Sequence, residues 1–308
     1  MAVLSSRLPT LQTQLDATQS LLSAVETRML SVLRTSTAPH AAVTAAAQQA
    51  AAYHLGSGGQ RIRARIASHA CTALKLSSGD TVSIAAAAEL VHNASLIHDD
   101  LQDRDISRHG NDSVWVAFGD GIAICAGDVL LSAAYCALAG ISRTHLLPTL
   151  ISLLHGRVSD ASVGQCVDLK KEQLQTITLE AYEHLATLKA GALLSLPIEL
   201  ALAAAGQLQA LPAARKAANS FAIGYQIFDD LNDIQKDASR LDVHPAINAV
   251  AVIRAMNVDD NPTAHARKLA LMHLANAAEW SLLLPNKSGL LLQVLALDLR
   301  AQIESRLA

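Results

Sequence analysis

The chain carries one pattern twice, as Ser95-Leu-Ile-His-Asp-Asp-Leu-Gln-Asp103 and as Tyr225-Gln-Ile-Phe-Asp-Asp-Leu-Asn-Asp233. Each copy is an Asp-Asp-x-x-Asp motif that follows apolar residues. A lone copy is equally consistent with a solvated helix end, but two copies far apart in one chain are not easily accidental. The glycine and glutamate positions of a calcium-binding EF-hand loop are missing, so that kind of site is excluded.

The spacing of the aspartates indicates a metal site. On a helix, Asp99 and Asp103 are one turn apart and share a face, as do Asp229 and Asp233. Like charges repel at that spacing, so a cation is expected beside them. Carboxylate oxygens suit Mg²⁺, which keeps positions open for water and substrate phosphates. The sequence therefore predicts a Mg²⁺–diphosphate site to which two facing helices contribute.

The rest of the sequence predicts helix almost throughout. Alanine and leucine dominate, and the 308 residues include only 15 glycines and 8 prolines. Apolar residues recur with a helical period in the first 33 residues, and no strand alternation or Asn-Gly hairpin turn occurs. Breaks are expected at residues 37–40, 56–59, 77–80, 109–112, 119–121, 211–212, 242–245, 259–262 and 285–289. No break has the length of an interdomain linker, so one all-α domain over residues 1–308 is predicted, although the length alone also allows two.

Composition excludes several functional classes. Hydrophobic residues make up 51 % of the chain, enough for a large core and against disorder. A net charge of −3 disfavours nucleic acid as the main partner. The four cysteines lack any Cys-x-x-Cys spacing, so neither a disulfide framework nor a zinc site is expected.

The sequence predicts no membrane span and a cytoplasmic location. Residues 1–10 contain no apolar region typical of a secretory signal. Residues 122–141 are mostly apolar, but Asp128 near the middle costs about 2.5–3.5 kcal/mol in a membrane. A buried helix is the better interpretation of that stretch.

Other polar residues have two interpretations each. His92 lies two turns before Asp99 and shares its face, either as a ligand-facing residue or as a core histidine. Gln226 precedes Asp229 by one turn and is either structural or ligand-facing. The segment Gly56-Ser-Gly-Gly-Gln-Arg-Ile-Arg-Ala-Arg65 is glycine-rich and then basic, which suits an anion at a helix start. Beside two acidic motifs, it indicates the second half of a diphosphate pocket.

At these residues the sequence resembles the trans-polyprenyl diphosphate synthases (polyprenyl synthetases), which have the isoprenoid synthase fold. The resemblance extends from about residue 30 to residue 255. Besides the two aspartate motifs, its carriers are Gly58-Gly59-Gln60-Arg61-Ile62-Arg63, Glu89-Leu90-Val91-His92, Ser107-Arg108-His109-Gly110, Gly127-Asp128, Gly164-Gln165, Lys189-Ala190-Gly191-Ala192-Leu193 and Tyr225-Gln226.

The resemblance implies a large helical bundle with a central apolar pocket, a homodimer, and Mg²⁺ as cofactor. It also implies a Mg²⁺-dependent trans-prenyltransferase that joins an allylic prenyl diphosphate to isopentenyl diphosphate. By this resemblance the metal ligands are Asp99, Asp103 and Asp229, supported by Asp100, Asp230 and Asp233. Contacts to the allylic diphosphate are expected from Arg108, Lys189 and Gln226, with Lys189 counted as catalytic. Contacts to isopentenyl diphosphate are expected from Arg63 and His92, and from the positions of Gln60 and His109.

The sequence departs from the family pattern at four places. The family has lysine where this chain has Gln60 and arginine where it has His109, and both positions fall at the isopentenyl diphosphate site. A threonine is replaced by Ala190, and the loop after the second motif is short. Losing two cations weakens an anion site, so two alternatives stay open. One is a lyase-like enzyme that ionises a prenyl diphosphate without condensation, although the 3 % of aromatic residues disfavour it. The other is a non-catalytic partner subunit.

The residues before Asp99 bear on product length. Ala94 and Ser95 lie about one turn before it, where family members can place the floor of the prenyl-tail pocket. Both are small, so a product of about twenty carbons or longer is expected under this resemblance. The alternative is that Ala94 is a helix-packing contact.

Overall fold

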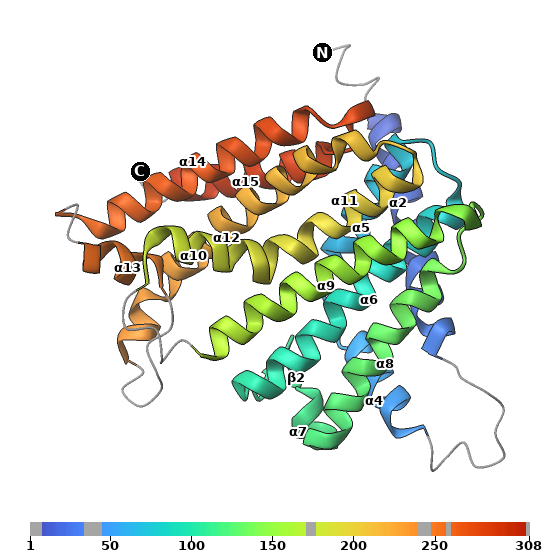
Figure 1. Ribbon diagram of the computed structural model, residues 1–308, viewed down its shortest axis with the longest axis horizontal. Helices are drawn as coiled ribbons and strands as arrows, with labels where there is room; N and C mark the ends of the chain where they lie inside the picture. Colours follow the sequence, from blue (N-terminus) through green and yellow to red (C-terminus); the bar gives the residue numbers. More distant parts are fainter. Residues whose placement is uncertain (1–7, 34–44, 171–176, 240–247, 257–259, 306–308) are drawn as a thin grey trace. The chain divides into compact units, whose positions relative to one another are not determined.

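The computed structural model describes residues 8–33, 45–170, 177–239, 248–256 and 260–305, with residues 8–19 and 233–239 described by their backbone alone. Nearly all of these residues are helical, which confirms the all-α prediction (Figure 1). The chain divides into two compact units, Met1–Ile151 and Ser152–Ala308. Each unit is described by itself below, and a single domain stays a prediction.

The first unit is built around α6 (Ser78–Asp103), a helix of 26 residues. Ser77 is the N-cap of this helix, because its hydroxyl accepts a hydrogen bond from the Asp80 backbone N–H at 3.1 Å. Its alanines, Ala85 to Ala88, are fully buried and let neighbouring helices approach closely. Helices α5, α8 and α2 pack against it. The other elements are α2 (Leu8–Leu33), α4 (Ala46–Gly56), α5 (Ile62–Ala73), α7 (Val114–Phe118), α8 (Asp120–Leu138) and η1 (Thr144–Leu146).

A short hairpin after α6 differs from the sequence prediction, which included no strand. Strands β1 (Ser107–Arg108) and β2 (Asn111–Asp112) pair antiparallel, with Arg108 opposite Asn111. The two residues between them, His109 and Gly110, both have positive φ, 52° and 81°. Positive φ at both central residues is the geometry that two-residue hairpin turns favour. The turn was missed because histidine stands where Asn-Gly hairpins have asparagine.

The second unit is centred on α12 (Leu211–Ser239), which packs extensively on α14 (Pro262–Leu282). The two helices approach closely at Gly224, where a Cβ would lie 2.8 Å from Leu274. Helix α11 (Ala192–Ala204) is buried along its whole length. The remaining elements are α9 (Leu147–Leu169), which begins in the first unit, α10 (Leu179–Ala186), η3 (Thr187–Gly191), η4 (Leu208–Ala210), α13 (Ala249–Met256), η5 (Pro285–Lys287) and α15 (Leu290–Ser305).

The predicted breaks were mostly placed well, with one shift. A break was expected at residues 211–212, but α12 starts at Leu211, because proline is tolerated in the first turn of a helix. The predicted breaks at 37–40 and 242–245 fall outside the described residues.

Two helical stretches of the described residues have the length and apolar composition of a membrane span. They are residues 120–138, which overlap the apolar stretch at residues 122–141 noted above, and residues 179–204. In their most apolar windows, 44 % and 72 % of the residues are buried. The core helix of a globular protein meets the same criteria.

Candidate active site

The first aspartate motif lies in the last two turns of α6. Asp99 is half-buried and Asp103 is exposed, and their spacing places both carboxylates on one face of the helix. Asp100 points about 100° away from Asp99 around the helix axis and is fully buried. The three carboxylates of this motif therefore have different surroundings.

Asp100 is held by Arg108 from strand β1. Its oxygens accept two hydrogen bonds from Arg108 Nε, at 2.8 and 2.9 Å, and a third bond from Nη2. The Asp100 side chain is 0 % exposed and that of Arg108 is 25 % exposed. This hydrogen-bonded pairing raises the pKa of the Arg108 guanidinium above its ordinary value. Asp100 thus fixes the direction of the Arg108 side chain, which the family resemblance predicts to contact the allylic diphosphate.

The hairpin also brings His109 to the glycine-rich loop. A Cβ on Gly59 would lie 3.5 Å from His109 Nε2, so the imidazole lies against the backbone of Gly59. Gly59 has a φ of 112°, a region that glycine adopts readily. Gln60 follows in the chain and is exposed. The structure therefore brings together the two segments in which Gln60 and His109 replace the family's cationic residues.

Two further histidines lie among the arginines of this region. Burial, and then the charges of Arg108 and Arg61, lower the pKa of His54 to about 4. Burial, and then the charges of Arg63 and Arg108, hold the pKa of His92 well below its ordinary value. Both imidazoles are therefore neutral at pH 7, and the positive charge of the cluster comes from its arginines.

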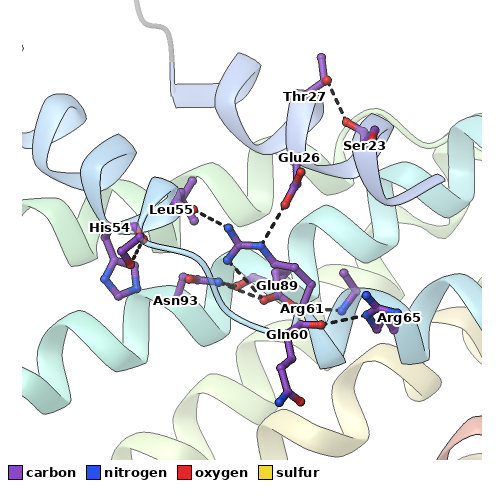
Figure 2. A network of polar contacts seen from close by, with 12 residues as sticks. Ser23, Glu26, Thr27, His54, Leu55, Gln60, Arg61, Arg65, Glu89 and Asn93 are labelled. Carbon is purple, nitrogen blue, oxygen red and sulfur yellow. Dashed lines mark hydrogen bonds and ion pairs between the residues drawn. The ribbon is translucent and has the colours of Figure 1, made fainter. Parts of the chain in front are cut away.

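A polar network fixes the glycine-rich loop to its surroundings (Figure 2). Arg61 has a left-handed backbone conformation, with φ 52°, and donates to the Leu55 carbonyl and to Glu26. Buried Glu89 lies 4.0 Å from Arg61 and accepts the Ala64 backbone N–H at 2.9 Å, which caps the start of α5. The Arg61 guanidinium thus binds groups of the protein rather than pointing into solvent.

The same view separates the roles of the other residues in this basic segment. Arg65 Nε donates to the Gln60 carbonyl at 2.9 Å. The Gln60 side chain points away from Arg61 and Glu89 (Figure 2). Of the segment's side chains, Arg61 and Arg65 therefore hold its backbone, whereas Gln60 is directed outward.

The second motif lies on α12 in the second unit. Asp229 is half-buried, Asp230 is 7 % exposed, and the Asp233 side chain lies outside those that the structure describes. Asp230 accepts hydrogen bonds from Tyr182 Oη at 2.8 Å, Gln226 Nε2 at 3.0 Å and the Ala249 backbone N–H at 2.7 Å. The Gln226 amide nitrogen is thus directed at Asp230. Burial, and then the nearby Asp230 carboxylate, raise the pKa of Tyr182, so its hydroxyl remains a donor.

Lys189 lies on the π-helical turn η3, a kind of distortion that is frequent at functional sites. Its Nζ is 2.7 Å from Asp168 Oδ2 on α9. Two glycines let this turn pack closely. A Cβ on Gly164 would lie 2.8 Å from the backbone nitrogen of Lys189. A Cβ on Gly191 would lie 2.6 Å from Asn219 Oδ1 on α12. The backbone that carries Lys189 is therefore fixed on two sides.

The aspartates suit Mg²⁺ by their donor chemistry, because they offer hard oxygen ligands one helical turn apart. Among the described residues no group of three or more His, Cys, Asp or Glu side chains converges on one point. Mg²⁺ is usually bound by one or two protein carboxylates together with substrate phosphates. A pair of carboxylates is therefore a usual number of protein ligands for this ion. The mutual arrangement of the two motifs stays a prediction, since they belong to different units.

Sequence reasoning gave no role to three residues that anchor the candidate site. They hold its side chains or backbone rather than carry its charge, and they are Glu89, Asp168 and Tyr182. Asp168 had a signal, since it follows Gly164 by one helical turn. Glu89 had one too, as a carboxylate among buried residues three before His92. Tyr182 had none, because its partner lies 48 residues away.

Comparison with known proteins identifies the family. A family model described as polyprenyl synthetase matches residues 44–246, about two thirds of the chain. The chain belongs to the polyprenyl synthetase family. The resemblance stated from the motifs is therefore confirmed.

Individual members of the family agree with this assignment. The short chain isoprenyl diphosphate synthase of Methanothermobacter thermautotrophicus is 30 % identical over 194 residues, which are 63 % of this chain and 60 % of that protein. The geranylgeranyl diphosphate synthase of Mycobacterium tuberculosis is 33 % identical over 183 residues, 59 % of this chain and 52 % of that protein. The matched stretch thus spans less than two thirds of either relative.

A solved structure shows the same fold. The geranylgeranyl pyrophosphate synthetase of Pyrococcus horikoshii superposes with a TM-score of 0.80 at 21 % identity, over 94 % of this chain and 99 % of that one. The fold expected for the family, an all-α isoprenoid synthase fold, is therefore confirmed.

Proposed function

We propose that the protein is a Mg²⁺-dependent trans-prenyltransferase that joins an allylic prenyl diphosphate to isopentenyl diphosphate. The observation that carries this proposal is the pairing of Arg108 with Asp100, in a member of the polyprenyl synthetase family. The pairing orients a guanidinium close enough to Asp99 for that carboxylate to help raise the Arg108 pKa. A fixed cation beside metal-binding carboxylates is what a diphosphate leaving group requires.

In the proposed reaction, the bond between the allylic carbon and the diphosphate oxygen breaks, and the oxygen keeps the electron pair. Mg²⁺, when bound, stabilises the charge that develops on the leaving diphosphate. Asp99, Asp103 and Asp229 would hold the metal, and Arg108, Lys189 and Gln226 would contact the phosphates once substrate is bound. The double bond of isopentenyl diphosphate then attacks the allylic carbon, and the resulting carbocation loses a proton to the released diphosphate, which restores a double bond. No nucleophilic serine or cysteine is needed.

The acceptor diphosphate is proposed to bind at the cationic cluster of the first unit. Arg63 and His92 belong to that cluster, because the Arg63 charge contributes to the low pKa of His92. His109 lies against Gly59, directly before Gln60. Gln60 and His109 give this site hydrogen-bond donors in place of the family's two permanent charges, so we expect weak binding of isopentenyl diphosphate rather than none.

We propose a product of about twenty carbons or longer. Ala94 is buried and small, which agrees with an open tail pocket, although a packing contact is equally buried. Two relatives described above carry names that specify geranylgeranyl or short-chain isoprenyl products. Those names support a product near twenty carbons.

We also propose a homodimer in the cytoplasm. Helix α9 presents Val163 and Val167, which are 51 % and 37 % exposed and one turn apart, as an apolar face that a second copy would cover. All four cysteines are free thiols, which suits a reducing compartment.

The lyase-like alternative is favoured by one observation, the outward-directed neutral Gln60 at the acceptor site. Such an enzyme would release diphosphate from the allylic substrate without forming a longer chain. A non-catalytic partner subunit would turn over neither substrate. Retention of both aspartate motifs disfavours this third possibility, because their repulsion serves no purpose without a metal.

One incubation separates the three. Purified protein with Mg²⁺ and labelled farnesyl diphosphate is followed with and without isopentenyl diphosphate. We expect a longer labelled prenyl diphosphate only when isopentenyl diphosphate is present. Diphosphate release that is independent of isopentenyl diphosphate would instead establish the lyase, and no turnover in either incubation would contradict both enzymes.

A further inference from the structure

One carboxylate of the second motif, Asp230, binds protein donors within the second unit. Asp230 accepts hydrogen bonds from Tyr182, Gln226 and the Ala249 backbone N–H, and its own carbonyl accepts Asn248 Nδ2 at 3.1 Å. The Tyr182 and Ala249 donors share one oxygen, Oδ2, and Gln226 binds the other. Three neutral donors thus surround a side chain that is only 7 % exposed.

These donors come from different elements of the second unit. Tyr182 is on α10, Gln226 is on α12 itself, and Ala249 is the first residue of α13. The three helices pack on one another (Figure 1). Asp230 therefore joins α10 and the start of α13 to the helix that carries Asp229.

Helix α10 continues directly into η3, which carries Lys189. This continuous segment is fixed to α12 at two points. At one end, Gly191 lies so close to Asn219 that a Cβ would come within 2.6 Å of its side-chain oxygen. At the other end, Tyr182 donates to Asp230. Lys189 lies between the two attachments, so both set its position along α12.

We propose that Tyr182 is a positioning residue that acts through Asp230 to hold Asp229 and Lys189 in one fixed arrangement. Anchoring the Asp230 side chain fixes the rotation of α12 about its axis. Because successive side chains of a helix point in set directions, it also fixes the direction of Asp229. The inference rests on the proposed function, in which Asp229 binds metal and Lys189 faces the diphosphate. It assigns Asp230 to the hydrogen-bonded clamp rather than to the metal.

The test measures binding of Mn²⁺, a spectroscopic substitute for Mg²⁺, together with inorganic pyrophosphate by electron paramagnetic resonance. Tyr182→Phe keeps the buried ring and removes one donor, so we expect Mn²⁺–pyrophosphate binding to weaken about fivefold. Ser281→Ala is the matched control, because it removes a buried hydroxyl that donates to the Ala277 carbonyl at 2.7 Å on α14. It should lower the unfolding temperature comparably and leave binding within about twofold of the wild type.

Variants of Asp230 decide whether Tyr182 acts through it. Asp230→Asn keeps an oxygen for Tyr182 and Ala249, and its amide faces Gln226, which can turn its own oxygen inward. Binding should then stay within about threefold of the wild type, whereas Asp229→Asn should lose about a hundredfold. In an Asp230→Ala background, adding Tyr182→Phe should weaken binding no further.

Three results would overturn the inference alone. They are a Tyr182→Phe protein that binds as the Ser281→Ala control does, an Asp230→Asn protein as impaired as Asp229→Asn, and additive effects of Tyr182→Phe and Asp230→Ala. A wild-type protein that binds no Mn²⁺–pyrophosphate would overturn the proposed function, and this inference with it.

Discussion

The two aspartate motifs are alike in sequence but differ in what holds their middle carboxylate. In the first unit, Asp100 is bound by the guanidinium of Arg108. In the second unit, Asp230 is bound by neutral donors, among them the Tyr182 hydroxyl and the Ala249 N–H. Among the described contacts, a guanidinium thus holds the first middle carboxylate and neutral donors hold the second.

This difference extends to the surroundings of each motif. The first unit gathers arginines and low-pKa histidines near Arg108, as the shifts of His54 and His92 show. In the second unit, Lys189 is balanced by Asp168 at 2.7 Å. One sequence pattern therefore occurs in two surroundings, a cluster of arginines and histidines in the first unit and a set of hydrogen bonds between helices in the second.

The largest expected difference is the cost of removing each partner. Arg108→Ala leaves the fully buried Asp100 charge uncompensated, which should cost about 3 kcal/mol of unfolding free energy. Tyr182→Phe removes one neutral donor from Asp230 and should cost about 1 kcal/mol. Thermal unfolding should show a drop about three times larger for Arg108→Ala.

The double variant Asp100→Asn with Arg108→Ala is the control for this comparison. It removes the charge together with its partner, so it should recover most of the lost stability. Equal losses for Arg108→Ala and Tyr182→Phe would mean that the two environments do not differ as described.

A smaller effect is expected in the pH dependence of stability. The pKa of His54 is about 4 in the folded protein and 6.5 ordinarily, so the unfolded chain takes up a proton first as the pH falls. Stability should be unaffected by His54 above about pH 6.5, and should decrease from there towards pH 4, by about 2 kcal/mol at pH 5. His54→Gln should therefore show a smaller loss of unfolding temperature between pH 7.5 and pH 5.

His145→Gln, an exposed substitution in the same unit, serves as the reference for that experiment. It should retain the wild-type pH dependence. A His54→Gln protein with the same acid sensitivity as His145→Gln would show that His54 does not titrate in this way.

Much of the fold followed from the sequence, because helical periodicity and helix breaks are local signals. The start of α6 at its Ser77 cap and the break at Gly58–Gly59 needed no tertiary information. At the hairpin of His109–Gly110 the sequence predicted a break but not the strands, since the turn has histidine where the Asn-Gly signal has asparagine. Among the predicted site residues of the first unit, Arg108 binds Asp100, and the charges of Arg63 and Arg108 act on His92.

The anchoring role of Tyr182 could not be predicted from the sequence, for a physical reason. A hydrogen bond such as that of Tyr182 to Asp230 joins positions 48 residues apart, and no periodicity reports it. The family resemblance gave Asp229 as a metal ligand and Asp230 as a supporting residue, but the sequence could not show which groups bind Asp230. Only burial and the surrounding donors separate a candidate ligand from a clamp.

The central claim is that the two motifs hold Mg²⁺ for one reaction. The direct measurement is turnover of Asp99→Ala and Asp229→Ala at saturating substrates and Mg²⁺, with Asp298→Ala, an exposed change on α15, as the control. Each motif variant should lose about a thousandfold in turnover while keeping its helical circular dichroism, since metal stabilisation of the leaving group amounts to about 4 kcal/mol. Near-normal turnover in either variant would contradict the account.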